Sequence, residues 1–310
     1  MIVYYVSAHG YGHATRSSAL AAALGEPVTI VTSAPARLFP GFAVEPPFPG
    51  LDLGLLQKDA LVVDLEATRR AHEELERRWD EGVAHERARL RRLKAKLVIS
   101  DVASMPFEAA ECPAVAVANF DWDWMLLSLG LPGFRHADAY RKATLYLRLP
   151  MGAPTAAFRR VEEAPLMGRV SRLTREQARE AAGLGLDEKV ALIAFGGFET
   201  GYKVDLPGYK LLRVGPQSLD LPFVDLVQAC DLVVGKPGYG TMSEALLHER
   251  PMLYIPRPDF PETPFLVDWA SRHGHVRPLD EGPWTEPLKW PPSRKDGAAV
   301  IASRIRQLLA

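Results

Sequence analysis

Short apolar runs alternate with longer stretches of mixed apolar and polar residues along most of the chain. The apolar runs are bounded by Gly, Pro or Asp, which is how buried strands usually end. This alternation is typical of βα units arranged around parallel sheets. In the first half, the pattern predicts buried strands at residues 2–7, 28–32, 97–100 and 114–118.

The second half repeats the alternation. It predicts strands at 190–195, 210–214, 232–234 and 252–255, and helices near 174–182, 239–248 and 265–273. The last stretch, 295–309, has the apolar face of an amphipathic helix, formed by Val300, Ile301, Ile305 and Leu308.

Residues 64–96 form a long, charged segment with a helical pattern, in which the apolar side chains fall near one face. Glu–Arg pairs four residues apart, Glu73–Arg77 and Glu74–Arg78, add support. The Arg-rich end of the segment, 87–96, is open to two interpretations: a site for an anionic acceptor, or a solvated helix face. Charge runs of this kind are usually solvated, so we favour the second.

The pattern loosens between residues 149 and 165, where three prolines and a glycine predict an extended linker. A chain of 310 residues has room for two domains of about 150 residues. We therefore expect a first domain at 1–150, a second at 166–294, and a C-terminal helix at 295–310 that packs back on the first domain.

Composition indicates a soluble globular protein, because apolar residues make up 47% of the chain and charged residues 24%. The formal net charge of −1 provides no strong field for nucleic acid or an anionic membrane. No run of about 20 apolar residues predicts a membrane span, and the N-terminus lacks the basic region and cleavage site of a signal peptide. We expect a cytoplasmic protein, with Cys112 and Cys230 as buried thiols rather than a disulfide or a metal site.

The first chemical feature is a glycine turn at residues 7–16, between the first strand and the first helix. Gly10 and Gly12 allow close backbone approach at the carboxyl end of a parallel strand, where such sheets bind ligands. The spacing nearly matches a dinucleotide fingerprint, but Thr15 replaces the third glycine. The acidic residue expected after the second strand is missing too, so the turn does not indicate a nicotinamide cofactor.

Two histidines in this turn, His9 and His13, suit acid–base chemistry because imidazole titrates near neutral pH. The alternative is that they cap the helix or satisfy backbone groups. Asp101 follows the strand at 97–100, so it should lie on the same edge of the sheet as His13. There it would orient the imidazole ring, cap the next helix, or do both.

A second glycine turn lies at residues 235–246, between a strand and a helix. The amides of residues 240–242 and the Thr241 hydroxyl form an anion site in this pattern, to which Lys236 adds charge. Gly196 and Gly197 also follow a strand and allow close approach of a phosphate. Glu244 is open to two interpretations, as the acid of a capping box with Thr241 or as the acceptor of hydrogen bonds from a ribose diol.

These motifs carry a specific resemblance. The second turn, Gly-Tyr-Gly-Thr-Met-Ser-Glu-Ala, resembles the donor-site turn of GT-B glycosyltransferases, and Gly-Tyr-Gly-His resembles their acceptor-side turn. More closely, the chain is similar to the glycosyltransferase-like N-terminal domain of plant L-arabinokinases and its free-standing bacterial relatives. The shared stretches are 7–16, 98–110, 117–124, 235–245 and 260–266.

The resemblance implies roles for the matching residues. His13 matches the catalytic base of inverting GT-B enzymes, and Asp101 the aspartate that orients it. Glu244 matches the residue that contacts the ribose, and Glu262 one that faces the donor sugar. With Lys236 added from its charge, the expected donor-binding set is Gly196, Gly197, Lys236, Gly238, Gly240, Thr241, Glu244 and Glu262. The Asp-Gln pair familiar in the last loop of relatives is absent, as is the sugar-kinase domain with its ATP loop.

The acceptor side is less defined. Asp121 and Trp122 follow the strand at 114–118 and, with Asp123 and Trp124, combine aromatic faces with carboxylates, a pairing suited to sugars. The alternative, equally favoured, is that the tryptophans attach a helix to the core. The expected acceptor-side set is His9, Gly10, Gly12, Arg16, Asp121 and Trp122.

We therefore expect an α/β protein with the GT-B fold, in which two Rossmann-like domains face a cleft. The expected activity is sugar transfer from a nucleotide diphosphate sugar, a UDP-sugar first, to a hydroxyl acceptor by direct displacement. Neither a metal nor a cofactor is expected, because helix amides and Lys236 supply the positive charge. Two alternatives remain: a nucleotide-sugar epimerase or hydrolase on the same fold, and a non-catalytic nucleotide-sugar-binding module.

Overall fold

The structure is a computed structural model, which describes residues 1–310 except 59–61, 196–202, 215–220, 258, 292–295 and 310. The chain divides into two compact units. The first comprises Met1–Lys58, Val63–Met167 and Gly297–Ala310, and the second is built mainly from Gly168–Asp296. Among the described residues, no helix combines the length and the apolar character needed to cross a bilayer.

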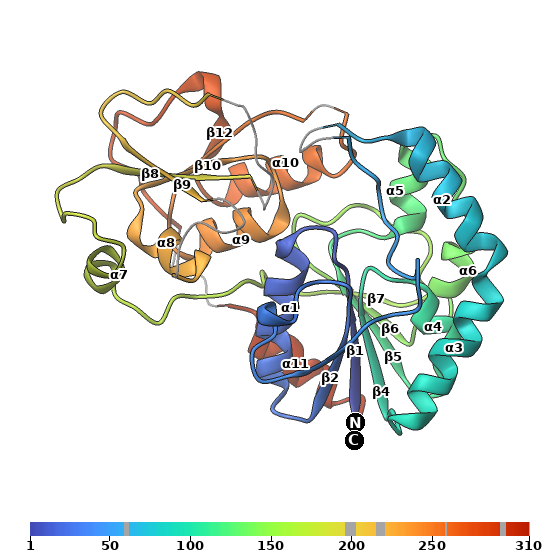
Figure 1. Ribbon diagram of the computed structural model, residues 1–310. Coiled ribbons are helices and arrows are strands. Elements are labelled where there is room, and N and C mark those ends of the chain that lie inside the picture. Colours follow the sequence, from blue (N-terminus) through green and yellow to red (C-terminus); the bar gives the residue numbers. More distant parts are fainter. Residues whose placement is uncertain (59–61, 196–202, 215–220, 258, 292–295, 310) are drawn as a thin grey trace. The chain divides into compact units, whose positions relative to one another are not determined.

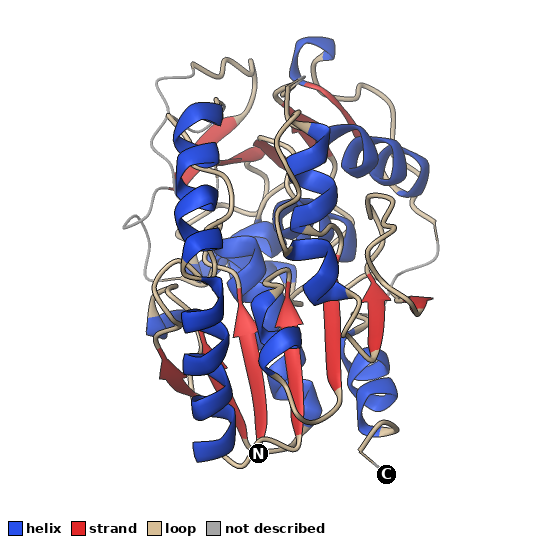
Figure 2. Cartoon of the chain, turned by 90° about the vertical axis from the view of Figure 1, so that its right-hand side faces the viewer, coloured by secondary structure: helices blue, strands red, loops and turns tan. Residues whose placement is uncertain are grey.

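The first unit contains a parallel sheet with the strand order β3-β2-β1-β4-β5-β6-β7. Its central strands are buried along their whole length, as expected for a sheet covered by helices on both faces. Figure 2 shows these strands running side by side. Their bounds are β1 (Ile2–Val6), β2 (Val28–Val31), β3 (Ala43–Glu45), β4 (Leu97–Asp101), β5 (Ala114–Ala118), β6 (Leu145–Arg148) and β7 (Val161–Glu163).

Helices cover both faces of this sheet (Figure 1). On one face lie α1 (Tyr11–Leu24) and α11 (Ala298–Arg306), which pack against each other. Arg306 of α11 donates to the carbonyls of Ala23 and Leu24, each at 3.0 Å. The remaining helices of the unit are α2 (Leu65–Arg77), α3 (Trp79–Arg92), α4 (Met105–Ala109), α5 (Trp122–Ser128), α6 (His136–Tyr140) and the short 3₁₀ helix η1 (Ala36–Leu38).

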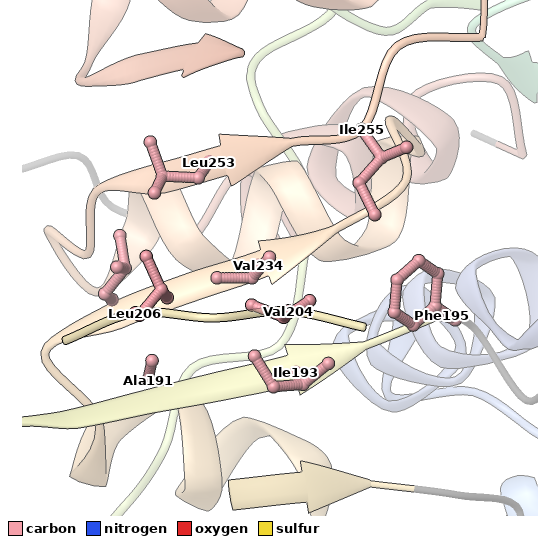
Figure 3. Close-up of a cluster of buried hydrophobic side chains, with 9 residues drawn as sticks. Ala191, Ile193, Phe195, Val204, Leu206, Val234, Leu253 and Ile255 are labelled. Carbon is pink, nitrogen blue, oxygen red and sulfur yellow. The ribbon is translucent and has the colours of Figure 1, made fainter. Parts of the chain in front are cut away.

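The second unit contains a parallel sheet with the order β12-β11-β10-β8-β9. Figure 3 shows apolar side chains of β8, β10 and β11, including Ile193, Val234 and Leu253, packed on one face of this sheet. The strands are β8 (Val190–Ala194), β9 (Lys210–Val214), β10 (Leu232–Gly235), β11 (Met252–Tyr254) and β12 (Val276–Pro278). The helices are α7 (Arg175–Ala181), α8 (Phe223–Ala229), α9 (Tyr239–Leu247), α10 (Thr263–His273) and the 3₁₀ helix η2 (Leu279–Glu281).

The helical pattern expected at 64–96 is present as two helices, because the chain turns at Arg78 (φ −102°, ψ 6°), which ends α2 and precedes α3. Two other expectations were wrong in detail. The segment expected as a linker contains β7, an edge strand whose exposed residues carry no apolar pattern. Cys230 is buried as expected, but Cys112 is only half-buried, in the loop that precedes β5.

The Arg-rich end of α3 is a paired helix face. Arg89 and Arg92 each contact Glu45 at 2.6 Å, and Arg91 contacts Glu111 at 2.5 Å. These guanidinium groups are already matched by carboxylates, which argues against an anionic-acceptor site. Arg91 and Arg92 are exposed, as expected for a solvated face, whereas Arg89 is buried.

Two buried histidines, His72 on α2 and His136 on α6, form a hydrogen-bonded row. His72 Nε2 donates to the Gly54 carbonyl at 3.0 Å, so its Nδ1 accepts from His136 Nε2 at 3.4 Å. The Ser104 hydroxyl donates to His136 Nδ1 at 2.7 Å. With both rings neutral, each ring nitrogen in this row has a hydrogen-bond partner. Burial lowers the pKa of His72, and burial together with His72 lowers the pKa of His136 to about 3.

We expect the protein to lose stability as the pH falls below about 6.5, the ordinary histidine value. The unfolded chain takes up protons there, whereas folded His136 does so only near its lowered pKa of about 3. Because of this one group, the free energy of unfolding should be lower by roughly 2 kcal/mol at about pH 5 than at neutral pH. Urea unfolding of the wild type and of His136→Gln, each at neutral pH and at about pH 5, measures the difference. An equal loss in both proteins would show that His136 does not contribute.

Candidate active site

The first glycine turn places the start of α1 at the carboxyl end of β1. Gly10, which precedes α1, has φ 87°, a left-handed conformation that favours glycine. The strand β1 pairs with β4 so that Val6 lies opposite Asp101. The side chains at the start of α1 are therefore close to the end of β4.

Asp101 is completely buried and collects four side-chain donors. His13 Nδ1 lies 3.0 Å from its Oδ1. Arg16 makes a bidentate contact, Nη2 to Oδ1 at 2.6 Å and Nε to Oδ2 at 2.8 Å, and the Ser17 hydroxyl donates to Oδ2 at 3.0 Å. The contact expected between His13 and Asp101 is present, and it is part of a larger network.

Burial by itself would raise the pKa of Asp101, but the Arg16 guanidinium and His13 outweigh it and hold that pKa well below its usual range. The carboxylate is therefore ionised. Arg16, expected on the acceptor side, is 1% exposed, so its guanidinium is held inside the protein. A surface position would leave Asp101 as a buried charge without a cation, and the fold instead turns Arg16 inward.

His9, the competing candidate for a base, is held by a backbone group. Its Nε2 donates to the Leu53 carbonyl at 2.6 Å, and its ring lies edge-on to Trp122 with the centroids 5.4 Å apart. A Cβ at Gly54 would lie 2.0 Å from the His9 ring, so this residue must be glycine. The ring of His9 therefore fixes the loop at residues 53–54. This contact favours the alternative given above, in which the histidine satisfies a backbone group.

Asp121 and Trp122 lie at the start of α5. Asp121 caps the helix, because its Oδ1 accepts from the Trp124 amide at 2.8 Å. Burial raises the pKa of Asp121 to about 6. Trp122 is buried against Phe120, and within the described residues no acceptor reaches its Nε1. The structure thus supports the helix-packing interpretation for both residues. Within the described residues, the indole N–H of Trp122 is not hydrogen-bonded.

In the second unit, Gly238 precedes α9, and the first bond of the helical ladder runs from the Met242 amide to the Gly238 carbonyl at 3.0 Å. The amides of residues 239–241 come before that bond and form the N-terminus of the helix. The expected anion site therefore starts one residue earlier than the sequence indicated. Gly235 is required by packing, because a Cβ there would lie 2.0 Å from the Ala194 carbonyl oxygen.

Glu244 does not form the capping box. Thr241 lies inside α9 rather than at its cap, and among the described residues no side chain caps this helix. The buried Glu244 carboxylate instead accepts a bidentate contact from Arg169, Nε to Oε1 at 2.7 Å and Nη2 to Oε2 at 3.2 Å. Arg169 was not singled out in the sequence, and its position before α7 carries no local signal of this pairing.

Charged residues also gather beyond β10 and β11. Burial and the nearby Arg257 cation lower the pKa of Lys236 to about 8, against the opposing effect of Glu262. Arg257 is buried, and its guanidinium lies over the Phe260 ring, 4.2 Å from the centroid. Glu262 is buried at the start of α10. Arg257, which the sequence pattern did not single out, thus joins Lys236 and Glu262. Gly196 and Gly197 lie outside the described residues.

A hollow of about 260 Å³ lies beside this group. Its lining residues come from the end of β11 and from α10: Tyr254, Pro256, Arg257, Thr263, Pro264, Val267 and Asp268. In the described part of the chain, no three His, Cys, Asp or Glu side chains are grouped so as to hold a metal ion.

The chain is similar to known proteins both in sequence and in fold. No protein-family model matches the chain. An L-arabinokinase of Arabidopsis thaliana is 33% identical over an alignment of 307 positions, and the match takes in 86% of this chain but only 29% of that protein. The chain therefore spans less than a third of the length of this relative.

Solved structures of glycosyltransferases align with nearly the whole chain. The glycosyltransferase of kitacinnamycin has a TM-score of 0.57 at 16% identity, with 100% of this chain and 90% of that one covered. UGT2 of Phytolacca americana, complexed with UDP-2-fluoroglucose and pterostilbene, has a TM-score of 0.55 at 11% identity, with 99% and 90% covered. MurG of Acinetobacter baumannii has a TM-score of 0.52 at 13% identity, with 100% and 90% covered. The chain therefore has the α/β fold of the GT-B glycosyltransferases, and its sequence resembles that of L-arabinokinase.

Proposed function

We propose that the chain is a glycosyltransferase that moves a sugar from a nucleotide diphosphate sugar, a UDP-sugar first, to a hydroxyl acceptor. The observation that carries the proposal is the contact of His13 with the buried, ionised Asp101 at the carboxyl end of the first sheet. A carboxylate that holds Nδ1–H of a neutral imidazole leaves Nε2 as the basic nitrogen.

The proposed reaction is one direct displacement. His13 Nε2 accepts the proton of the acceptor hydroxyl while the acceptor oxygen forms a bond to the anomeric carbon of the donor. The bond from that carbon to the diphosphate oxygen breaks, and its electron pair leaves with the nucleoside diphosphate. Asp101 stabilises the imidazolium that forms, as orienting carboxylates do in comparable pairs.

The second unit supplies the positive field for the leaving group. The N-terminal amides of α9 form an anion site, and Lys236 lies next to this turn. Dipoles already aimed at the leaving diphosphate stabilise its charge without rearrangement. We propose that this arrangement replaces a divalent metal, and that Glu244 accepts the ribose hydroxyls. The complex of Phytolacca americana UGT2 with UDP-2-fluoroglucose supports a nucleotide-sugar donor.

A second function is favoured by a specific observation. The chain covers only 29% of the L-arabinokinase that it resembles, so in that protein the matching part belongs to a larger whole. A non-catalytic module that binds a nucleotide sugar would fit this observation. Such a module would bind nucleoside diphosphates but would release no glycosylated product. Turnover with a panel of nucleotide sugars and hydroxyl acceptors, followed by mass spectrometry of the products, separates the two functions.

If Glu244 accepts a ribose diol, Glu244→Ala should weaken nucleoside diphosphate binding by about 1–3 kcal/mol, the range for hydrogen bonds to a charged group. Calorimetry with UDP measures the loss. Arg169→Met is the matched control, because it breaks the same ion pair but leaves the carboxylate in place. Both variants should be less stable, and only Glu244→Ala should lose affinity selectively. Equal affinities in the two variants would reject the ribose contact.

If His13 is the base, His13→Ala should lower turnover by about 10²-fold or more, because general base catalysis is worth that much. Nucleotide affinity should stay unchanged, since the proposed donor contacts belong to the second unit. The measurement is kcat together with calorimetry of UDP binding. A larger loss of kcat in His9→Ala than in His13→Ala would reassign the base to His9.

A further inference from the structure

The network around Asp101 contains more than an orienting carboxylate requires. A carboxylate that only orients an imidazole needs one contact to Nδ1. Here the same carboxylate also binds Arg16 through two nitrogens and accepts from Ser17. Arg16 is itself fixed from behind, because its Nη1 donates to the Asn119 side chain at 2.7 Å. The guanidinium is therefore held in one orientation inside the protein.

The charges in this network balance. Asp101 is fully buried and Arg16 is 1% exposed, so their interaction is weakly screened by solvent. One carboxylate and one guanidinium cancel, and His13 can stay neutral without leaving a net buried charge. Without Arg16, the buried carboxylate would favour a proton on itself or on His13, because a buried charge is costly unless it is paired.

The position of His13 Nδ1 shows that Arg16 also acts on the imidazole. This nitrogen lies 3.0 Å from Asp101 Oδ1 and 3.0 Å from Arg16 Nη2. With a proton on Nδ1, the ring donates to Asp101 and Nε2 is the basic nitrogen. With a proton on Nε2, Nδ1 accepts from Arg16. A doubly protonated ring would be a second cation beside the guanidinium, so the Arg16 charge opposes the imidazolium.

Two phenols that interact with the network in the described part of the chain do not supply a compensating charge. Tyr4 on β1 and Tyr146 on β6 both interact electrostatically with Arg16 and Asp101. Burial raises the pKa of Tyr4 and of Tyr146 far above neutrality, so both phenols are uncharged. Phe120, whose ring lies edge-on to His13, is apolar. Of the charged groups that the described contacts place at His13, Asp101 and Arg16 are the two that decide its charge.

We infer that Arg16 is a positioning residue for the proposed reaction: it keeps Asp101 ionised, cancels its charge at His13, and thereby sets the pH range in which His13 is a neutral base. The inference rests on the proposed function for the role of His13 as a base. The charge balance itself requires no turnover and is measured in the protein without substrate.

The test is an NMR titration of the ¹³C,¹⁵N-labelled His13 ring in the full chain. In Arg16→Met, the uncancelled Asp101 should move the midpoint of the His13 titration to higher pH by about one unit or more, the usual effect of a close charge. The double variant Arg16→Met with Asp101→Asn removes both charges and should return the midpoint toward the wild-type value. Arg16→Lys keeps the charge and should stay close to wild type.

Two further variants make the test independent of the folding of Arg16→Met. Asp101→Asn leaves Arg16 as the only charge beside the ring and should move the midpoint to lower pH. Ser17→Ala, the matched control, removes a neutral contact to the same carboxylate and should leave the midpoint in place. A purely structural role of Arg16 predicts no opposite shifts in Arg16→Met and Asp101→Asn, and no return in the double variant.

The inference is overturned if folded Arg16→Met titrates like the wild type, if Asp101→Asn shows no shift to lower pH, or if Ser17→Ala shifts as far as Arg16→Met. In an active enzyme, the acidic limb of the pH dependence of kcat/KM should follow the NMR midpoints. A protein that shows the NMR shifts but forms no glycosylated product would contradict the proposed function and leave the charge balance standing.

Discussion

The buried carboxylate of Asp101 is the group around which the polar side chains at the start of α1 are arranged. Parallel pairing of β1 with β4 brings Asp101 opposite Val6, so the helix that follows β1 begins next to it. Residues three apart on a helix share one face, which is why His13 and Arg16 reach the same carboxylate. A charge that is fully buried is tolerated only when it is paired and hydrogen-bonded. Helix α1 provides both the cation that pairs with Asp101 and the hydrogen-bond donors.

The second unit has the same strand–turn–helix arrangement, but with different chemical groups at the turn. A strand ends at Gly235, a turn follows, and α9 begins with amides that no earlier turn of the helix can use. The first unit has the proposed base in this position, whereas the second has a helix N-terminus and a lysine whose pKa burial lowers to about 8. Each unit therefore carries one part of the proposed chemistry, proton acceptance in the first and stabilisation of an anion in the second.

The sequence was informative where burial has a local pattern. The central strands could be predicted because both of their faces are covered, which makes them short, continuous apolar runs. The edge strand β7 could not, since its residues are exposed. The His13–Asp101 contact followed from parallel topology, because two strand ends share one edge of the sheet. The inward turn of Arg16 could not be predicted, because its partner lies 85 residues away, and the pairing of Arg169 with Glu244 across 75 residues has the same cause.

The central claim is that nucleotide binding and the base belong to different units. Amide NMR spectra of the labelled protein, recorded while UDP is added, test it most directly. The account predicts that the largest shifts occur at the amides of residues 239–241 and around Glu244, with little change at His13 and Arg16. Shifts concentrated at residues 10–13 of the first turn, with none at the start of α9, would contradict it.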